Sequence, residues 1–166
     1  MSRIVAIDYG GKRCGIAVTD ALQIIAQGLC TVETKNLMSF LEEYVQKESV
    51  AQFVLGMPLK FDGSDGHITE AVRKFIKQLE QKFPTIPVQT INEQFTSKEA
   101  VRTLVIVGVP KMKRRNKALV DKMSACIILQ DYMQQQSGDA FAMPTEIPPT
   151  LSRKRSSNHK KNYKRK

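Results

Sequence analysis

Three acidic residues stand at positions where carboxylates can do chemistry. Asp8 closes one apolar run, Glu93 follows another, and Asp121 lies near the start of a helical pattern. In open sheets, sites form in the crevice at the carboxyl ends of strands, where we expect Asp8 and Glu93. Carboxylates that meet repel one another, and a divalent cation relieves this; hard oxygen ligands favour Mg²⁺ or Mn²⁺. Such a site suits phosphodiester hydrolysis, in which the ions stabilise the attacking and leaving oxygens.

Each acid also has a purely structural interpretation. Asp8 comes shortly before Gly10-Gly11 and is a typical turn former. Asp121 could complement the dipole of its own helix. Glu93 taken alone indicates nothing. Spacing by itself therefore leaves both interpretations open.

Basic residues cluster beside two of these acids. Lys12 and Arg13 follow Asp8 across the glycine turn. The segment that leads to Asp121 contains Lys111, Lys113, Arg114, Arg115 and Lys117. Basic clusters that converge on acidic ligands indicate a nucleic-acid backbone as substrate, although a solvated loop without a partner is the alternative. The residues expected to bind substrate are Lys12, Arg13, Arg114, Arg115 and Lys117.

The net charge of the chain is concentrated at one end. The 166 residues are enough for one domain, and their formal net charge is +10. Eight of the 26 Lys and Arg residues, and no acid, lie from Ser152 onward, so 18 basic residues face 16 acids elsewhere. We therefore predict a domain over 1–136 and a flexible basic tail over 137–166. The tail either adds electrostatic affinity for nucleic acid or is a solubilising or ribosome-contacting extension.

The cysteines and the hydropathy pattern bear on the compartment. Cys14, Cys30 and Cys126 are an odd, scattered set, which favours reduced thiols in the cytoplasm over a disulfide framework or a zinc site. No apolar run approaches the roughly 18 residues of a membrane span. A strand-like run begins at once after the first residues, which leaves no room for a signal peptide. We expect a cytoplasmic protein without a membrane partner.

The elements that must position the acids follow from the apolar pattern. Strands are predicted over Arg3 to Ile7, Cys14 to Thr19, Gly28 to Glu33, Gln52 to Leu55 and Val88 to Ile91. The turn between the first two is so short that they should form an antiparallel hairpin. A β-meander followed by alternating helices and strands predicts an α/β fold, with a mixed sheet covered by helices.

Four helices are predicted between and after the strands. They cover residues 37–45 with Asn36 as cap, residues 68–83, a segment from Thr96 through about Val107 with Thr96 and Glu99 in a capping box, and Ala118 to Gln135. In the last helix Ala125, Ile128 and Tyr132 share the face of Asp121. Asp121 should therefore face the sheet.

Four stretches in order resemble one known family. The run I-D-Y-G-G-K-R-C-G-I-A-V (Ile7 to Val18) resembles the opening signature of the YqgF-type family, whose members are described as Holliday-junction resolvases or pre-16S rRNA nucleases. The other stretches are L-G-M-P-L-K-F-D-G-S-D-G (Leu55 to Gly66), N-E-Q-F-T-S (Asn92 to Ser97) and R-N-K-A-L-V-D-K-M-S-A-C-I-I-L-Q-D-Y-M (Arg115 to Met133). The resemblance spans residues 3–135.

This resemblance implies both a fold and a site. The fold is ribonuclease H-like, with a five-stranded sheet in the order 3-2-1-4-5, strand 2 antiparallel and helices on both faces. The acidic residues of the family fall on Asp8, Glu93 and Asp121 of this chain. The usual Asp-Glu-Arg before the Thr-Ser pair is here Asn92-Glu93-Gln94. The central Glu is kept, but the missing Arg removes a planar cation suited to phosphate.

The function expected from the resemblance is a Mg²⁺- or Mn²⁺-dependent endonuclease for structured nucleic acid. The favoured substrate is the 5′ end of pre-16S rRNA in ribosome biogenesis, and Holliday junctions are the second class. The alternative, favoured by Gln94, is a non-catalytic factor that binds RNA or the ribosome on the same fold. Nucleotide hydrolysis, suggested by a likeness of the first hairpin to the actin and sugar-kinase group, would need two such domains. Monomer and homodimer both stay open.

Overall fold

Five strands form one mixed sheet at the centre of the molecule. The computed structural model describes residues 1–58, 67–93, 100, 102–104, 110, 113 and 116–137. The strands are β1 (Arg3–Asp8), β2 (Arg13–Thr19), β3 (Ala26–Glu33), β4 (Val50–Pro58) and β5 (Val88–Glu93), in the order β3-β2-β1-β4-β5. β2 is antiparallel to both neighbours, whereas β1, β4 and β5 are parallel. The predicted strand order and the antiparallel second strand are confirmed.

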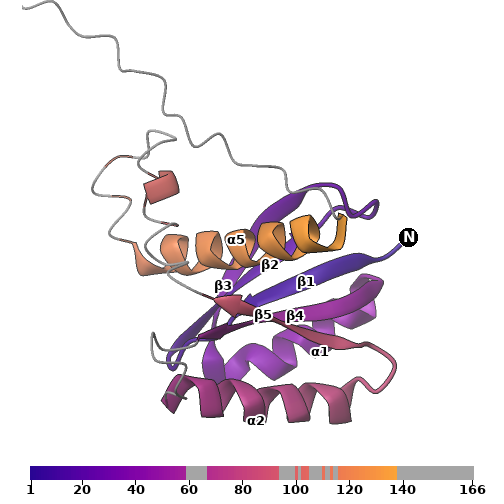
Figure 1. The fold of residues 1–166 in the computed structure, drawn as a ribbon. Helices are drawn as coiled ribbons and strands as arrows, with labels where there is room; N and C mark the ends of the chain where they lie inside the picture. Colours follow the sequence, from indigo (N-terminus) through magenta and orange to yellow (C-terminus); the bar gives the residue numbers. More distant parts are fainter. Residues whose placement is uncertain are drawn as a thin grey trace, which may run out of the picture.

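Helices cover both faces of this sheet (Figure 1). A short 3₁₀ turn, η1 (Thr34–Asn36), leads into α1 (Leu37–Lys47), which lies on one face together with α2 (His67–Lys82). The long helix α5 (Lys117–Ser137) covers the other face. The predicted layering, with helices on both faces, is therefore confirmed.

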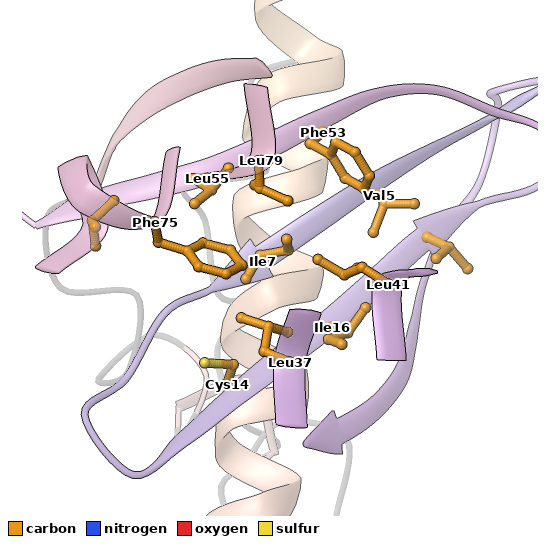
Figure 2. Close-up of a cluster of buried hydrophobic side chains, with 12 residues drawn as sticks. Val5, Ile7, Cys14, Ile16, Leu37, Leu41, Phe53, Leu55, Phe75 and Leu79 are labelled. Carbon is orange, nitrogen blue, oxygen red and sulfur yellow. The ribbon is translucent and has the colours of Figure 1, made fainter. Parts of the chain in front are cut away.

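Each face of the sheet has its own apolar core. The core under α1 and α2 contains Val5, Ile7, Cys14, Ile16, Val18, Leu37, Leu41, Phe53, Leu55, Val72, Phe75 and Leu79, most of them labelled in Figure 2. The core under α5 contains Ile4, Ala6, Ala17, Val54, Ile91, Ala125, Ile128, Leu129 and Tyr132. Successive residues of β1 alternate between the two cores, which is why its run Ile4 to Ile7 is apolar throughout. Ala125, Ile128 and Tyr132 face the sheet as predicted.

Several predicted details of the elements are wrong. Asn36 precedes α1 as expected, but its side chain makes no capping hydrogen bond, because the 3₁₀ turn already gives it a helical backbone (φ −100°, ψ −1°). β4 extends beyond its predicted ends at both sides, to Val50–Pro58. β5 runs on to Glu93, which is the last residue of the strand and does not follow it.

Other predictions fall outside the described residues. Residues 102–104 are helical, within the helix predicted after the fifth strand, but Thr96 and Glu99 of its capping box are not described. The segment 138–166 is likewise not described, so the boundary of the basic tail stays a prediction. None of the helices in the described ranges has the length and apolar character that a membrane span requires.

Contacts along β3 fix the direction of α5. Thr31 Oγ1 donates to the carbonyl of Ala118 at 2.7 Å, and Cys126 Sγ donates to the carbonyl of Ala26 at 3.6 Å. The later residue of β3 therefore contacts the earlier residue of α5, so the two elements are antiparallel. β3 is parallel to β1, since two antiparallel steps separate them. The amino end of α5 thus lies at the sheet edge where β1 ends.

We expect Thr31→Val to destabilise the domain by about 1 kcal/mol. Valine keeps the shape of the side chain but removes the donor to the Ala118 carbonyl, a loss typical of one neutral hydrogen bond. Urea unfolding measures the change. The matched control is Thr90→Val on β5, where the side chain is exposed and the change should stay within about 0.5 kcal/mol. Equal effects of the two variants would show that the Thr31 bond does not anchor α5.

Candidate active site at the carboxyl edge of the sheet

Asp8 lies on the face of the sheet that α5 covers. It is the last residue of β1, and its partner in the antiparallel ladder is Gly15 of β2. Paired residues of such a ladder project to the same face. A Cβ on Gly15 would collide with the carbonyl oxygen of Asp121, so this face is the one toward α5. Ile4 and Ala6, which alternate with Asp8 in register, belong to the core under α5 and agree with this.

Close packing at two glycines brings the first turns of α5 against the sheet. The backbone of Asp121 lies directly over Gly15, and the Lys122 side chain crosses Gly28, where a Cβ would lie 2.6 Å from Lys122 Cγ. Any larger residue at Gly15 would have to displace helix backbone, and not a flexible side chain. Because Gly15 is the ladder partner of Asp8, the same contact places Asp121 beside Asp8. The structure thus brings together two acids that are 113 positions apart in sequence.

The backbone of Glu93 ends at the same edge. β1, β4 and β5 run parallel, so Asp8, Pro58 and Glu93 close three adjacent strands in the same direction. The Cα of Glu93 pairs with that of Pro58 at the end of β4. Two strand spacings, about 10 Å, separate β1 from β5. The strands that carry Asp8 and Glu93 therefore end at the same edge of the sheet. The side chain of Glu93 lies outside the described part of the structure.

Arg13 forms an ion pair with Asp121. Its Nε donates to Asp121 Oδ2 at 3.3 Å, and the two side chains are 41% and 29% exposed. Arg13 opens β2, two residues before Gly15, and so lies on the same face of the strand. The pair joins positions 108 apart in sequence and was not predicted, although Arg13 itself was expected near a bound phosphate.

The loop that carries Lys12 and leads to Arg13 is held in place by Thr34, the first residue of η1. Thr34 donates its backbone N–H to the Lys12 carbonyl at 3.1 Å and its Oγ1 to the Gly10 carbonyl at 2.7 Å. Cys14 Sγ also contacts Gly10 O, at 3.8 Å. The backbone of this loop is therefore fixed next to Asp8.

The charges of both aspartates affect the pKa of the Cys14 thiol. Burial raises the pKa of the Cys14 thiol, and the negative charges of Asp8 and Asp121 raise that pKa further, while hydrogen bonds with Thr34 and Gly10 oppose the rise. Cys14 therefore lies within electrostatic reach of both carboxylates. The thiol stays protonated at neutral pH, and all three cysteines are free, as predicted.

The other predicted basic residues divide into two groups. Lys12 and Lys117 are exposed, and Lys117 is the first residue of α5. Asn116 caps this end of α5 by accepting the Ala118 N–H on Oδ1 at 3.0 Å. Arg114 and Arg115 lie outside the described residues. Lys12 and Lys117 thus flank the edge at which Asp8 and Asp121 meet.

The donor set fits a hard divalent cation. Asp8 and Asp121 offer oxygen ligands, and Ser124, one helical turn after Asp121, has a buried Oγ without a hydrogen-bond partner among the described residues. This hydroxyl, one helical turn from Asp121, is a buried polar atom with unused hydrogen-bonding capacity among the described residues. Among the described side chains, which do not include that of Glu93, no three His, Cys, Asp or Glu residues form a complete metal-binding group.

Sequence reasoning missed Gly15 and Ser124. Gly15 belongs to the first motif, in which it follows Arg13-Cys14. Its role cannot be predicted from the sequence, because it depends on where α5 packs. Ser124 gave no signal, because a serine on an otherwise apolar helix face is common. Both residues become informative only when the helix is in place.

A mixed five-stranded sheet in this order, with helices on both faces, is the architecture of the ribonuclease H-like fold. Comparison with known proteins names the family. The profile of the RuvX family, described as Holliday junction resolvase, matches residues 2–135. The chain belongs to the RuvX family of nucleases.

Relatives and solved structures agree with this assignment. A relative from Porphyromonas gingivalis is 51% identical over 133 residues, which are 80% of this chain and 96% of the relative. One from Bacteroides thetaiotaomicron is 47% identical over 136 residues, 82% of this chain and 99% of the relative. Both are provisionally named pre-16S rRNA nuclease.

Two solved resolvases have the same fold at low sequence identity. RuvC of T. thermophilus, in complex with Holliday junction substrate, aligns with a TM-score of 0.51 and 15% identity, covering 83% of this chain and 97% of that one. The Fowlpox virus resolvase, in complex with Holliday junction DNA, aligns with a TM-score of 0.50 and 14% identity, covering 81% and 98%. At these identities the likeness concerns the fold.

Proposed function

We propose that this protein is a Mg²⁺- or Mn²⁺-dependent endonuclease that hydrolyses phosphodiester bonds of structured nucleic acid, with Asp8, Glu93 and Asp121 as metal ligands and catalytic residues. One observation carries the proposal: α5 packs so closely on Gly15 that Asp121 lies beside Asp8. The family assignment and the end of β5 at Glu93 support it.

The acidic and the basic residues at this edge have separate roles in the proposed reaction. Asp8 and Asp121 hold the cation, and Glu93 completes the set from the end of β5. When bound, such an ion stabilises the negative charge that develops on the phosphate oxygens during hydrolysis. Lys12 and Lys117 contact the nucleic-acid backbone, together with Arg13, Arg114 and Arg115. The capped amino end of α5 adds a positive partial charge beside Lys117.

The favoured substrate is the 5′ end of pre-16S rRNA, and a branched DNA junction is the second. The choice of RNA follows the names of the relatives, of which the Porphyromonas gingivalis protein is 51% identical to this chain. The description of the family and the two structural neighbours favour the DNA junction as the second class. Processing of ribosomal RNA would place the protein in the cytoplasm, with the ribosome as a further partner.

The test is cleavage of both substrates by the same preparation. A 5′ fragment of pre-16S rRNA and a four-way DNA junction are incubated with the protein in Mg²⁺, in Mn²⁺ and in EDTA. We expect metal-dependent cleavage of the RNA by the wild type and none by Asp8→Asn. Cutting of the junction alone would reassign the substrate. Equal cutting by wild type and variant would expose a contaminant and contradict the proposal.

A non-catalytic role on the same fold is the second candidate. Gln94 stands where the family has an Arg, so one cation suited to phosphate is missing beside Glu93. Under this alternative the protein binds RNA or the ribosome equally well in EDTA and cuts neither substrate. The alternative is therefore decided by the same experiment, with a gel-shift assay added to the cleavage assay.

The basic tail gives a separate prediction on binding. Deletion of 152–166 removes eight cations and no acid. If the tail contacts the nucleic-acid backbone, fewer counterions are released, and the plot of log affinity against log salt becomes shallower. Titrations at several salt concentrations measure the slope. An unchanged slope would exclude the tail as a contact.

A further inference from the structure

The ion pair between Arg13 and Asp121 is weak by its geometry. The Nε to Oδ2 distance of 3.3 Å is longer than the roughly 2.7–2.9 Å of a good charge-assisted hydrogen bond. Both side chains are partly exposed, so water competes for each of them. The hydrogen bond to Asp121 uses a single N–H of the guanidinium, that of Nε, and is not a bidentate pair. A stronger ligand for Asp121 would therefore displace Arg13 at little cost.

The surroundings of Arg13 allow its side chain to move while its backbone stays. The preceding loop is held by the two hydrogen bonds of Thr34 to Gly10 and Lys12. The backbone at Gly10 lies so close to that at Arg13 that a Cβ on Gly10 would collide with the Arg13 carbonyl oxygen. The guanidinium, by contrast, is paired with Asp121 among the described residues and its side chain is 41% exposed. Rotation about its side-chain bonds alone can release it toward solvent.

We propose that Arg13 is a positioning residue with two alternative partners. In the metal-free protein it neutralises Asp121 and holds that carboxylate at the site. When a divalent cation takes Asp121, the guanidinium is released and donates to a phosphate of the nucleic acid. This inference rests on the proposed function, because it takes Asp121 as a metal ligand.

The chemistry of arginine suits both partners. The guanidinium is always charged and presents donors in a planar fork that matches carboxylate and phosphate alike. Repulsion between Asp8 and Asp121 would be strongest in the metal-free protein, where Arg13 offsets one of the two charges. After metal binding the same cation would offset the charge of the incoming phosphate. Metal and nucleic acid should therefore each strengthen the binding of the other.

The first test is the affinity for Mn²⁺ alone, measured by electron paramagnetic resonance without nucleic acid. We expect Arg13→Gln to bind Mn²⁺ roughly two- to fivefold more tightly, since the ion no longer competes with an ion pair of this strength. The matched control is Lys12→Gln, which removes the same charge from the neighbouring exposed position. It should change the affinity by less than about twofold, because an exposed charge is screened by salt.

The second test adds a cleavage-resistant 2′-O-methyl RNA with the pre-16S 5′ sequence. In the wild type this RNA should tighten Mn²⁺ binding, and Arg13→Gln should lose most of that gain, whereas Arg13→Lys should keep part of it.

The possible outcomes are distinguishable. Unchanged or weaker Mn²⁺ binding by Arg13→Gln, or an equal change in Lys12→Gln, would overturn the role of Arg13 and leave the proposed function standing. A wild-type protein that binds no Mn²⁺ would overturn the metal-dependent function itself.

Discussion

Asp8→Asn is expected to lower the rate of nucleic-acid cleavage by at least about 100-fold. Loss of a group that only supports a metal ligand already costs about 10- to 100-fold in metal affinity or activity, and loss of a ligand should cost no less. Asn keeps the size of the side chain but removes the charge that attracts the cation. Asp121→Asn should have an effect of the same size, because the two carboxylates meet at one edge of the sheet. Single-turnover cleavage of the pre-16S fragment measures both losses.

The matched control lies in the same helix as Asp121. Asp131→Asn makes the same chemical change ten residues further along α5, about 15 Å away. It should cleave at a rate close to that of the wild type. Thermal unfolding of the three variants distinguishes a loss of catalytic activity from a loss of folded protein. Loss of activity in all three, or in Asp8→Asn only through unfolding, would speak against the carboxylate site.

Gly15→Ala is expected to destabilise the domain by about 1–3 kcal/mol and to slow cleavage by about 10- to 100-fold. The added methyl group would collide with the backbone of Asp121 and Lys122, so α5 must shift to make room. A shift of about 1 Å in a catalytic group can cost 100-fold in rate. Urea unfolding gives the loss of stability, and cleavage of the same RNA fragment gives the loss of rate.

The neighbouring Gly11 supplies the control for this substitution. A Cβ on Gly11 would lie 3.9 Å from Ile68 Cδ1, an ordinary van der Waals contact. Gly11→Ala should therefore change stability by no more than about 0.5 kcal/mol, as expected at an exposed position. If Gly15→Ala is as stable and as active as Gly11→Ala, the close packing of α5 on β2 does not position the site.

The strands of the sheet could be predicted because they depend on apolar runs and turns that are local in the sequence. The apolar run Ile4 to Ile7 is buried on both faces, and the short turn after Asp8 permits only an antiparallel hairpin. The order of the strands came from the resemblance to a family and is confirmed. Element ends were less certain, because they depend on neighbours: β5 continues to Glu93 where its ladder with β4 continues to Pro58.

The candidate site was only partly accessible to sequence reasoning. The motifs identified Asp8 and Asp121, and the periodicity of the last helix placed Asp121 on the face toward the sheet. The pair Arg13–Asp121 and the contact of Asp121 with Gly15 join segments more than a hundred residues apart. Nothing local encodes them, because they arise from where α5 crosses β2. The buried position of the Ser124 hydroxyl depends on the same packing.

The most direct test of the carboxylate site is a crystal structure of the protein soaked in Mn²⁺, with anomalous data. We expect an anomalous peak between Asp8 and Asp121, within bonding distance of an oxygen of each carboxylate, with Glu93 as a further ligand. In the same crystal Arg13 should have left Asp121. Manganese bound only at other surfaces, with Arg13 still paired to Asp121 at saturating metal, would contradict the assignment.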